Sequence, residues 1–272
     1  MPSFSTHVVT TVLSEREGLQ RVALDSGRRA YVLTGLVGPV AVGDPVVVNT
    51  TAVDVGLGTG GWDVVHWNLA RSEWAVPGAG HVMKLRYTSL QADTGVAEEA
   101  EGYRAATLAG VPVVVLGVHS QLAPVAAAFC AGAPGRSLAF VMTDAAALPL
   151  ALSDLVADLR AAGLVHVTVS AGQAFGGDHE AVNALSGMEV AVGCGAGAVV
   201  VGPGPGGVGT GTAHGTSAVE GAALIDLAGR GGATPVVAVR WSDADPRPRH
   251  RGMSHHATTV LGLAHERAVV PV

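Results

Sequence analysis

The residues of this chain that are best suited to chemistry are histidines and arginines near its carboxyl end. The segment SDADPRPRHRGMSHH (242–256) contains three of each type. Imidazole titrates near neutral pH, so His255 and His256 are predicted to act as general acid or base. A guanidinium group forms bidentate hydrogen bonds with the oxygens of a phosphate or carboxylate, so Arg249 and Arg251 are predicted to hold an anion. Asp178, in QAFGGDHE (173–180), is predicted to orient or assist the histidines.

A second chemical signal is the glycine-rich stretch GPGPGGVGTGTAHGTSAVEG (202–221), which carries no charge before Glu220. Free glycine N–H groups, threonine hydroxyls and a helix predicted to begin at Ser217 together form an anion site. His119 and Ser120, which follow the strand predicted at 111–118, are assigned to the same site. The predicted anion-binding residues are Gly204, Gly206, Gly207, Gly209, Thr210, Thr212, Ser217, Arg249, Arg251, His119 and Ser120.

This stretch does not indicate an ordinary nucleotide site. GPGPGG (202–207) satisfies G-x-G-x-x-G after a predicted strand, but so does GLGTGG (56–61), which no predicted helix follows. The acidic residue expected about twenty positions later is missing. A Walker A loop needs a lysine directly after its glycines, and the chain's only lysine is Lys84.

Structural roles remain open for several of these residues. Ser120 and Asp144 precede predicted helices and can act as N-caps, as can Ser217 with Glu220 in a capping box. Asp178 can cap a helix whose first turn holds His179 and Glu180. A metal-assisted site also remains open, although the spacing matches no known metal motif and the sequence identifies no cofactor. Its potential ligands are His119, Asp144, Asp178, His179, His255 and His256.

Residues 77–272 are predicted to form the α/β domain, Rossmann-like in type, that positions these side chains. Nearly continuous apolar strands alternate with helical segments, which is typical of a doubly wound, mostly parallel sheet covered on both faces. The predicted strands are 81–88, 111–118, 137–143, 165–172, 198–202 and 234–241. The predicted helices are 96–110, 122–133, 148–162, 179–192 and 217–229, with a last one beginning near Ser254.

Polar residues follow the carboxyl ends of these strands, whereas the helix-to-strand connections, such as GAPGRS, are short and nearly featureless. Ligands of open parallel sheets bind outside the carboxyl ends of the strands. The segments that begin at His119, Asp144, Gln173, Gly204 and Ser242 are therefore predicted to converge on one rim.

Residues 1–76 are predicted to form a small antiparallel β-barrel or β-sandwich. Short alternating runs are separated by turn residues, and RVALDSGRRAYVL (21–33) is typical of a hairpin around Asp25, Ser26 and Gly27. Pro77, Gly78 and Gly80 mark the boundary with the second domain.

Composition limits the classes of partner. The chain has 272 residues, 49% of them hydrophobic, and a formal net charge of −6, which argues against a nucleic-acid partner. The apolar stretch at 190–219 is too rich in glycine and proline to span a membrane. No signal peptide is evident and the two cysteines indicate no disulfide framework, so a cytoplasmic protein is expected. A glycine-rich, weakly charged surface is compatible with a homodimer.

The chain also resembles an uncharacterised bacterial family, domain-of-unknown-function 3866. The stretches that carry the resemblance are MKLRYTSLQ, GQAFGGDHEAVN, GVGTGT and HRGMSHH, spread from Lys84 to the last helix. The resemblance supports the architecture, and it implies no activity or catalytic residue.

Two functions follow from the residues. The first is an enzyme, a hydrolase or group transferase, acting on an anionic small molecule, such as a phosphorylated one, at the carboxyl ends of the strands. The alternative is a non-catalytic metabolite-binding protein or sensor whose β domain contacts a partner. Turnover of whichever compound binds distinguishes them.

Overall fold

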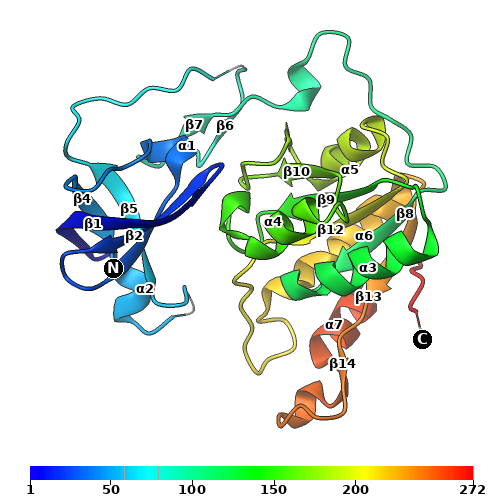
Figure 1. The fold of residues 1–272 in the computed structure, drawn as a ribbon. Helices are drawn as coiled ribbons and strands as arrows, with labels where there is room; N and C mark the ends of the chain where they lie inside the picture. Colours follow the sequence, from blue (N-terminus) through cyan, green and yellow to red (C-terminus); the bar gives the residue numbers. More distant parts are fainter. Residues whose placement is uncertain (58, 79, 272) are drawn as a thin grey trace. The chain divides into compact units, whose positions relative to one another are not determined.

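The computed structural model describes residues 1–57, 59–78 and 80–271, and it divides into two compact units, Met1–Gly78 and Ala79–Val272. Figure 1 shows a β-barrel unit with two short helices and an α/β unit, each of which has its own core. None of the helices in the described residues combines the length and hydropathy that a membrane span requires.

The first unit is a closed barrel, as predicted, with strand order β1-β2-β3-β5-β4. All neighbouring strands are antiparallel except β3 and β5, which are parallel. Alternate side chains such as Val22, Val46 and Val48 point inward and are fully buried. The strands are β1 (Phe4–Arg16), β2 (Leu19–Leu24), β3 (Arg29–Val32), β4 (Pro45–Asn49) and β5 (Trp62–Asn68), with short helices α1 (Thr34–Val37) and α2 (Thr51–Asp54) between them.

The second unit contains a six-stranded, entirely parallel sheet of order β11-β10-β9-β12-β8-β13. Every residue of β9 and β12 is buried, as expected of central strands that are covered on both faces. The strands are β8 (Pro112–Leu116), β9 (Leu138–Thr143), β10 (Val167–Ala171), β11 (His179–Ala181), β12 (Ala198–Pro203) and β13 (Thr234–Ala238).

Helices cover both faces of this sheet, which confirms the doubly wound α/β architecture (Figure 1). On one face, α3 (Leu122–Gly132) and α4 (Asp154–Ala161) pack on side chains such as Phe140. On the other, Met188, Ile225 and Val260 meet the valines of β8 and β12. These three residues belong to α5 (Ala184–Gly193), α6 (Glu220–Arg230) and α7 (His255–Leu263).

The strand order places a topological switch point between β8 and β12. The chain leaves β8 through α3 toward β9, on one face of the sheet, and leaves β12 through α6 toward β13, on the other face. Connections that leave adjacent strands in opposite directions separate their loops, and ligands of open α/β sheets bind at this point.

Three predicted elements differ from the structure. The strand expected at 81–88 is only β6 (Met83–Lys84), which pairs with β7 (Ala92–Asp93). The helix expected at 96–110 is reduced to the 3-10 helix η1 (Ala97–Glu99), and Gly102 follows it with φ +77°. The helix expected from residue 179 begins after Asn183, whose side chain accepts the Leu185 and Ser186 N–H groups, and β11 precedes it.

Candidate functional site

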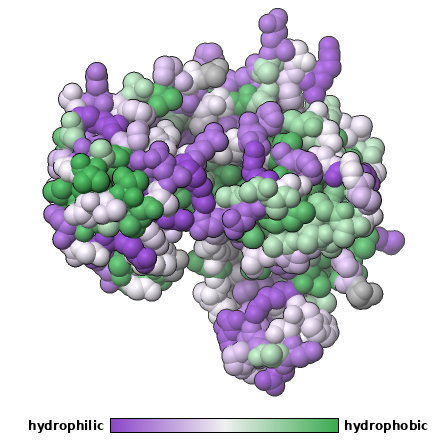
Figure 2. All heavy atoms as spheres, in the orientation of Figure 1, coloured by the Kyte–Doolittle hydropathy of each residue, from purple (hydrophilic) through white to green (hydrophobic). Residues whose placement is uncertain are grey.

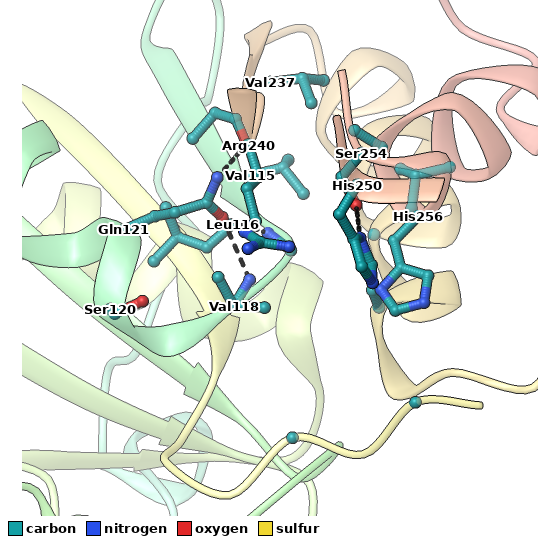
Figure 3. Close-up of a pocket in the computed structure, with 18 of the residues that line it drawn as sticks. Val115, Leu116, Val118, Ser120, Gln121, Val237, Arg240, His250, Ser254 and His256 are labelled. Carbon is teal, nitrogen blue, oxygen red and sulfur yellow. Dashed lines mark hydrogen bonds between the residues drawn. The ribbon is translucent and has the colours of Figure 1, made fainter. Parts of the chain in front are cut away.

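A pocket of about 450 Å³ opens at the carboxyl ends of β8, β12 and β13 (Figure 3). Its size lies within the range of small-molecule sites. Three polar segments form its walls: the turn after β8, the glycine loop after β12, defined here as residues 204–216, and the segment 240–257 after β13. Apolar side chains of the sheet and of α7, such as Val115, Val237 and Val260, form its base.

The turn after β8 is held by Gln121, at the end of the 3-10 helix η2 (His119–Gln121). Its Oε1 accepts the Gly117 and Val118 N–H groups at 2.9 and 3.1 Å, and its Nε2 donates to the Ala238 carbonyl at 2.6 Å. One side chain therefore joins the end of β8 to the end of β13. Ser120 lines the pocket beside it and is exposed.

The glycine loop contributes Gly207, Gly209 and Thr210 to the pocket. The loop is closed by Ser217, whose hydroxyl accepts the Val208 N–H at 3.1 Å. A Cβ atom on Gly209 would lie 2.8 Å from Cε1 of His256, so only glycine allows the imidazole to approach this closely. This contact brings the glycine loop and the double histidine into one site.

A short two-stranded ribbon positions the segment after β13. β14 (Trp241–Ser242) pairs with β15 (Gly252–Met253), and the Ser254 N–H donates to the Arg240 carbonyl at 2.9 Å. Between these strands the chain projects from the unit, and this projection is mostly hydrophilic on the face that Figure 2 shows. The ribbon places Arg240 next to the start of α7.

Arg240, Arg247 and Arg249 line the pocket, and one carboxylate, that of Asp245, pairs with the first two. Asp245 accepts from Arg247 at 3.0 Å through both oxygens, and from Arg240 at 2.5 Å. Hydrogen bonds from Arg247 hold the pKa of Asp245 well below its usual range, and Arg240 adds to this effect. Arg249 is exposed and has no ion-pair partner in the described part of the chain. The pocket wall therefore carries more positive than negative charge.

Three imidazole rings pack together at the same wall. The ring centroids of His250, His255 and His256 lie 4.1 to 5.2 Å from one another. His250 follows Pro248 in the 3-10 helix η5 (Pro248–His250), and the other two begin α7. Figure 3 shows Arg240 between Gln121 on one side and His250 and His256 on the other.

The surroundings of His250 and His256 favour neutral imidazole. Burial lowers the pKa of His250, and Arg247 and Arg240 lower it further. Burial also lowers the pKa of His256, as does the neighbouring His255. The Nε2 atoms of His255 and His256 are buried without a hydrogen-bond partner among the described residues. Two ring nitrogens are thus free to bind a ligand.

Several predicted anion-binding residues lie near the pocket without lining it. Gly204 packs against the loop after β9, where a Cβ would lie 2.6 Å from the Ala147 carbonyl oxygen. Gly206 adopts φ +87° in the turn that leads to Gly207. The Thr212 hydroxyl contacts that of Thr210 at 2.9 Å within the loop. Arg251 is exposed and lies outside the lining.

His119 joins three elements. Its ring contacts the Pro203 carbonyl at 3.0 Å through Nδ1 and the Ser153 hydroxyl at 2.7 Å through Nε2, and burial lowers its pKa. Both nitrogens are therefore engaged in positioning the rim. Asp144 accepts the Gln173 N–H at 2.9 Å and so joins the loops after β9 and β10.

Asp178 and His179 lie near the far edge of the sheet. The Asp178 carboxylate binds Arg160 and accepts the Thr168 N–H at 2.9 Å, beside the first residues of β10. His179 contacts the Cys194 thiol at 3.2 Å. β9 and β12 separate β10 from β8, so neither residue belongs to the pocket wall.

The capping box of Ser217 and Glu220, which was the alternative to a functional role for Ser217, does not form. Thr216 caps the 3-10 helix η4 (Ser217–Val219) that precedes α6. The Glu220 carboxylate instead accepts the Thr143 hydroxyl at 2.7 Å, and burial raises the pKa of Glu220.

Other pocket residues were not among those predicted to form the site: Gln121, Arg240, Arg247, His250 and Ser254. Arg240 fell inside the strand predicted at 234–241, but β13 ends at Ala238. The sequence did point to His250 and Arg247, because both lie in 242–256, the segment that contains the predicted arginines and histidines of the site. Gln121 and Ser254 lie in segments that were predicted to reach the rim, but neither residue was itself predicted to form the site.

A family model described as "Protein of unknown function (DUF3866)" matches residues 29–272, and the chain belongs to this family. No curated protein matches the chain.

Proposed function

We propose that this family member binds an anionic small molecule in the pocket at the ends of β8, β12 and β13, and acts on it by hydrolysis or group transfer. The observation that carries the proposal is the charge of the pocket wall: three arginines line it, and Asp245 pairs with only two of them, Arg240 and Arg247. An excess guanidinium beside a cavity of small-molecule size favours a phosphate or carboxylate ligand.

The glycine loop supports the same ligand class. The N–H groups of Gly207 and Gly209 have no hydrogen-bond partner among the residues described, and both glycines line the pocket. Backbone N–H groups bind anion oxygens without adding a charge. Arg249 and these N–H groups would hold the anion, with Ser120 at the opposite wall.

The histidines support chemistry at the bound anion. The unpartnered Nε2 of His256 lies in the pocket wall, where an imidazole can accept or donate a proton during hydrolysis or transfer. His255 stands directly beside it. Asp178, which lies away from the wall, has no part in this proposal.

Binding of inorganic phosphate, pyrophosphate and a panel of phosphorylated metabolites, measured by calorimetry, tests the anion site. Arg249→Ala removes the guanidinium that has no ion-pair partner among the described residues. It should weaken anion binding about 10- to 100-fold, because a charge-assisted hydrogen bond is lost. Arg251→Ala is the matched control, since it removes the same charge two residues away and outside the pocket. Equal losses in both variants would contradict a specific site.

Turnover separates an enzyme from a sensor. The wild-type protein should convert a compound that it binds, and His256→Gln should abolish conversion while the dissociation constant changes little. The alternative function is a non-catalytic sensor whose barrel contacts a partner; Phe4 and Leu13 of β1 are among the hydrophobic residues exposed there. Recovery of unchanged compound after prolonged incubation with the wild-type protein would favour that alternative.

A further inference from the structure

We propose that His250, His255 and His256 form a binding site for one divalent transition-metal ion of the Zn²⁺ type, with a further coordination position open to the pocket. The proposal goes beyond the anion site, and it does not require that any reaction occurs there.

The first argument is geometric. These histidines are the one group of three or more potential metal ligands found in residues 1–57, 59–78 and 80–271. Their ligand atoms lie within 4.8 Å of one another. Zn–N bonds of 2.0–2.1 Å in a tetrahedral site imply nitrogen separations of about 3.4 Å. Side-chain rotations that move the ring nitrogens by about 1 Å would bring their separations to the value of a tetrahedral site.

The second argument is the lack of other partners. A buried polar atom is costly unless it forms a hydrogen bond or binds an ion. Nε2 of His255 and Nε2 of His256 are both buried without a hydrogen-bond partner in the described residues. Two adjacent ring nitrogens without partners are explained if both bind the same ion.

The third argument is the support behind His250. This residue is only 3% exposed, and its Nδ1 contacts the Ser254 hydroxyl at 2.8 Å. Metal-binding histidines commonly engage their second nitrogen in this way, which fixes the orientation of the ring. The contact leaves Nε2 of His250 as the nitrogen for the ion.

The charge around the cluster indicates what occupies the remaining position. Arg240, Arg247 and Arg249 lie near the histidines, and Asp245 is the neighbouring carboxylate. Three neutral imidazoles leave both charges of the ion uncompensated, so an anion is favoured as the fourth ligand. Three histidines with an open position are typical of catalytic zinc sites. When the ion is bound, the ring nitrogens serve as ligands, and the role of proton acceptor passes to the fourth ligand.

Titration of chelator-treated protein with Co²⁺ alone, followed by displacement with Zn²⁺, tests the site. We expect one ion per chain and the intense visible absorption of low-coordinate Co²⁺, together with a higher melting temperature in Zn²⁺. The double variant His255→Gln/His256→Gln should lose the spectrum and the thermal shift. His214→Gln, which changes an exposed histidine of the glycine loop, should retain both.

Circular dichroism of each variant separates loss of the site from loss of the fold. Ser254→Ala keeps all three ligands and should weaken Co²⁺ binding about 10- to 100-fold. Absence of a Co²⁺ spectrum in the folded wild-type protein, or its persistence in the folded double variant, overturns the proposal. The Arg249→Ala experiment with inorganic phosphate reports on the anion site separately, because it changes no proposed ligand of the ion.

Discussion

Gly209 is the residue at which the two halves of the candidate site meet. Its missing side chain provides the space that the His256 ring occupies, and its own N–H group, with that of Gly207, is available to the pocket. Gly211, in the same loop, has no neighbouring atom within 4 Å of the position that a Cβ would occupy. Identical residues in one loop therefore have different roles, which depend on the atoms opposite them.

We expect Gly209→Ala to weaken phosphate binding at least about 10-fold, because the new methyl group would displace the His256 ring and a displacement near 1 Å is costly at a binding or catalytic site. Gly211→Ala is the matched control and should bind as the wild-type protein does. Calorimetric titration of the three proteins with phosphate or pyrophosphate measures the effect. Equal dissociation constants for both variants would show that the contact with His256 does not matter.

The residue types of the site were predictable from the sequence, but their separate roles were not. Arginines and histidines in 242–256 stand out because such residues are costly to order without a function. Whether an arginine is neutralised depends on a carboxylate brought near it by the ribbon of β14 and β15, as Asp245 is. No spacing rule distinguishes Arg247, which is paired, from Arg249.

Among the elements, β6 is short but carries a buried ion pair. Lys84, the chain's only lysine, is 1% exposed, and its ammonium donates to Glu180 Oε2 at 2.6 Å. It also donates to the Ser170 and Ala174 carbonyls. Burial raises the pKa of Glu180, and the ammonium opposes that rise. These contacts fasten β6 to the edge of the sheet at β10 and β11.

Lys84→Met should lower the free energy of unfolding by about 3–5 kcal/mol, because it leaves the Glu180 carboxylate buried without its counterion. The double variant Lys84→Met/Glu180→Gln removes both charges and should recover part of the loss. Urea unfolding followed by circular dichroism compares the three proteins. A double variant less stable than the single one would contradict the role given to the ion pair.

The central strands were the most predictable elements. β8, β9, β10, β12 and β13 are nearly continuous apolar runs, and each was expected within a few residues of its observed bounds. Their order was not predictable, because equally apolar strands give no information about which neighbours they pair with. β11 is only three residues long, too short for local periodicity to identify it as a strand. The segment after η1 forms no continuous helix, although its local periodicity predicted one at 96–110.

At the scale of the whole molecule, buried histidines make stability depend on pH. His119 joins the ends of β8 and β12 to the start of α4, and burial lowers its pKa in the folded protein. An unfolded chain takes up a proton on this residue near pH 6.5, whereas the folded protein does so only at lower pH. The contribution of His119 is therefore complete above that pH and decreases as the pH falls through it.

We expect the free energy of unfolding of the wild-type protein to decrease more between pH 7.5 and 5.5 than that of His119→Gln. The difference is limited to about 1.4 kcal/mol per pH unit, the value for one proton. Urea unfolding at several pH values measures both slopes, and comparing slopes removes the constant cost of the substitution. Parallel slopes would mean that His119 titrates alike in the folded and unfolded chains.

The walls of the pocket come from segments that are far apart along the chain, at residues 117–121, 207–210 and 240–257. During biosynthesis the amino-terminal barrel and β8 leave the ribosome long before β13 and α7 do. The pocket is therefore incomplete on a nascent chain until α7 emerges. Occupancy of the pocket would accordingly distinguish chains that include α7 from chains truncated before it.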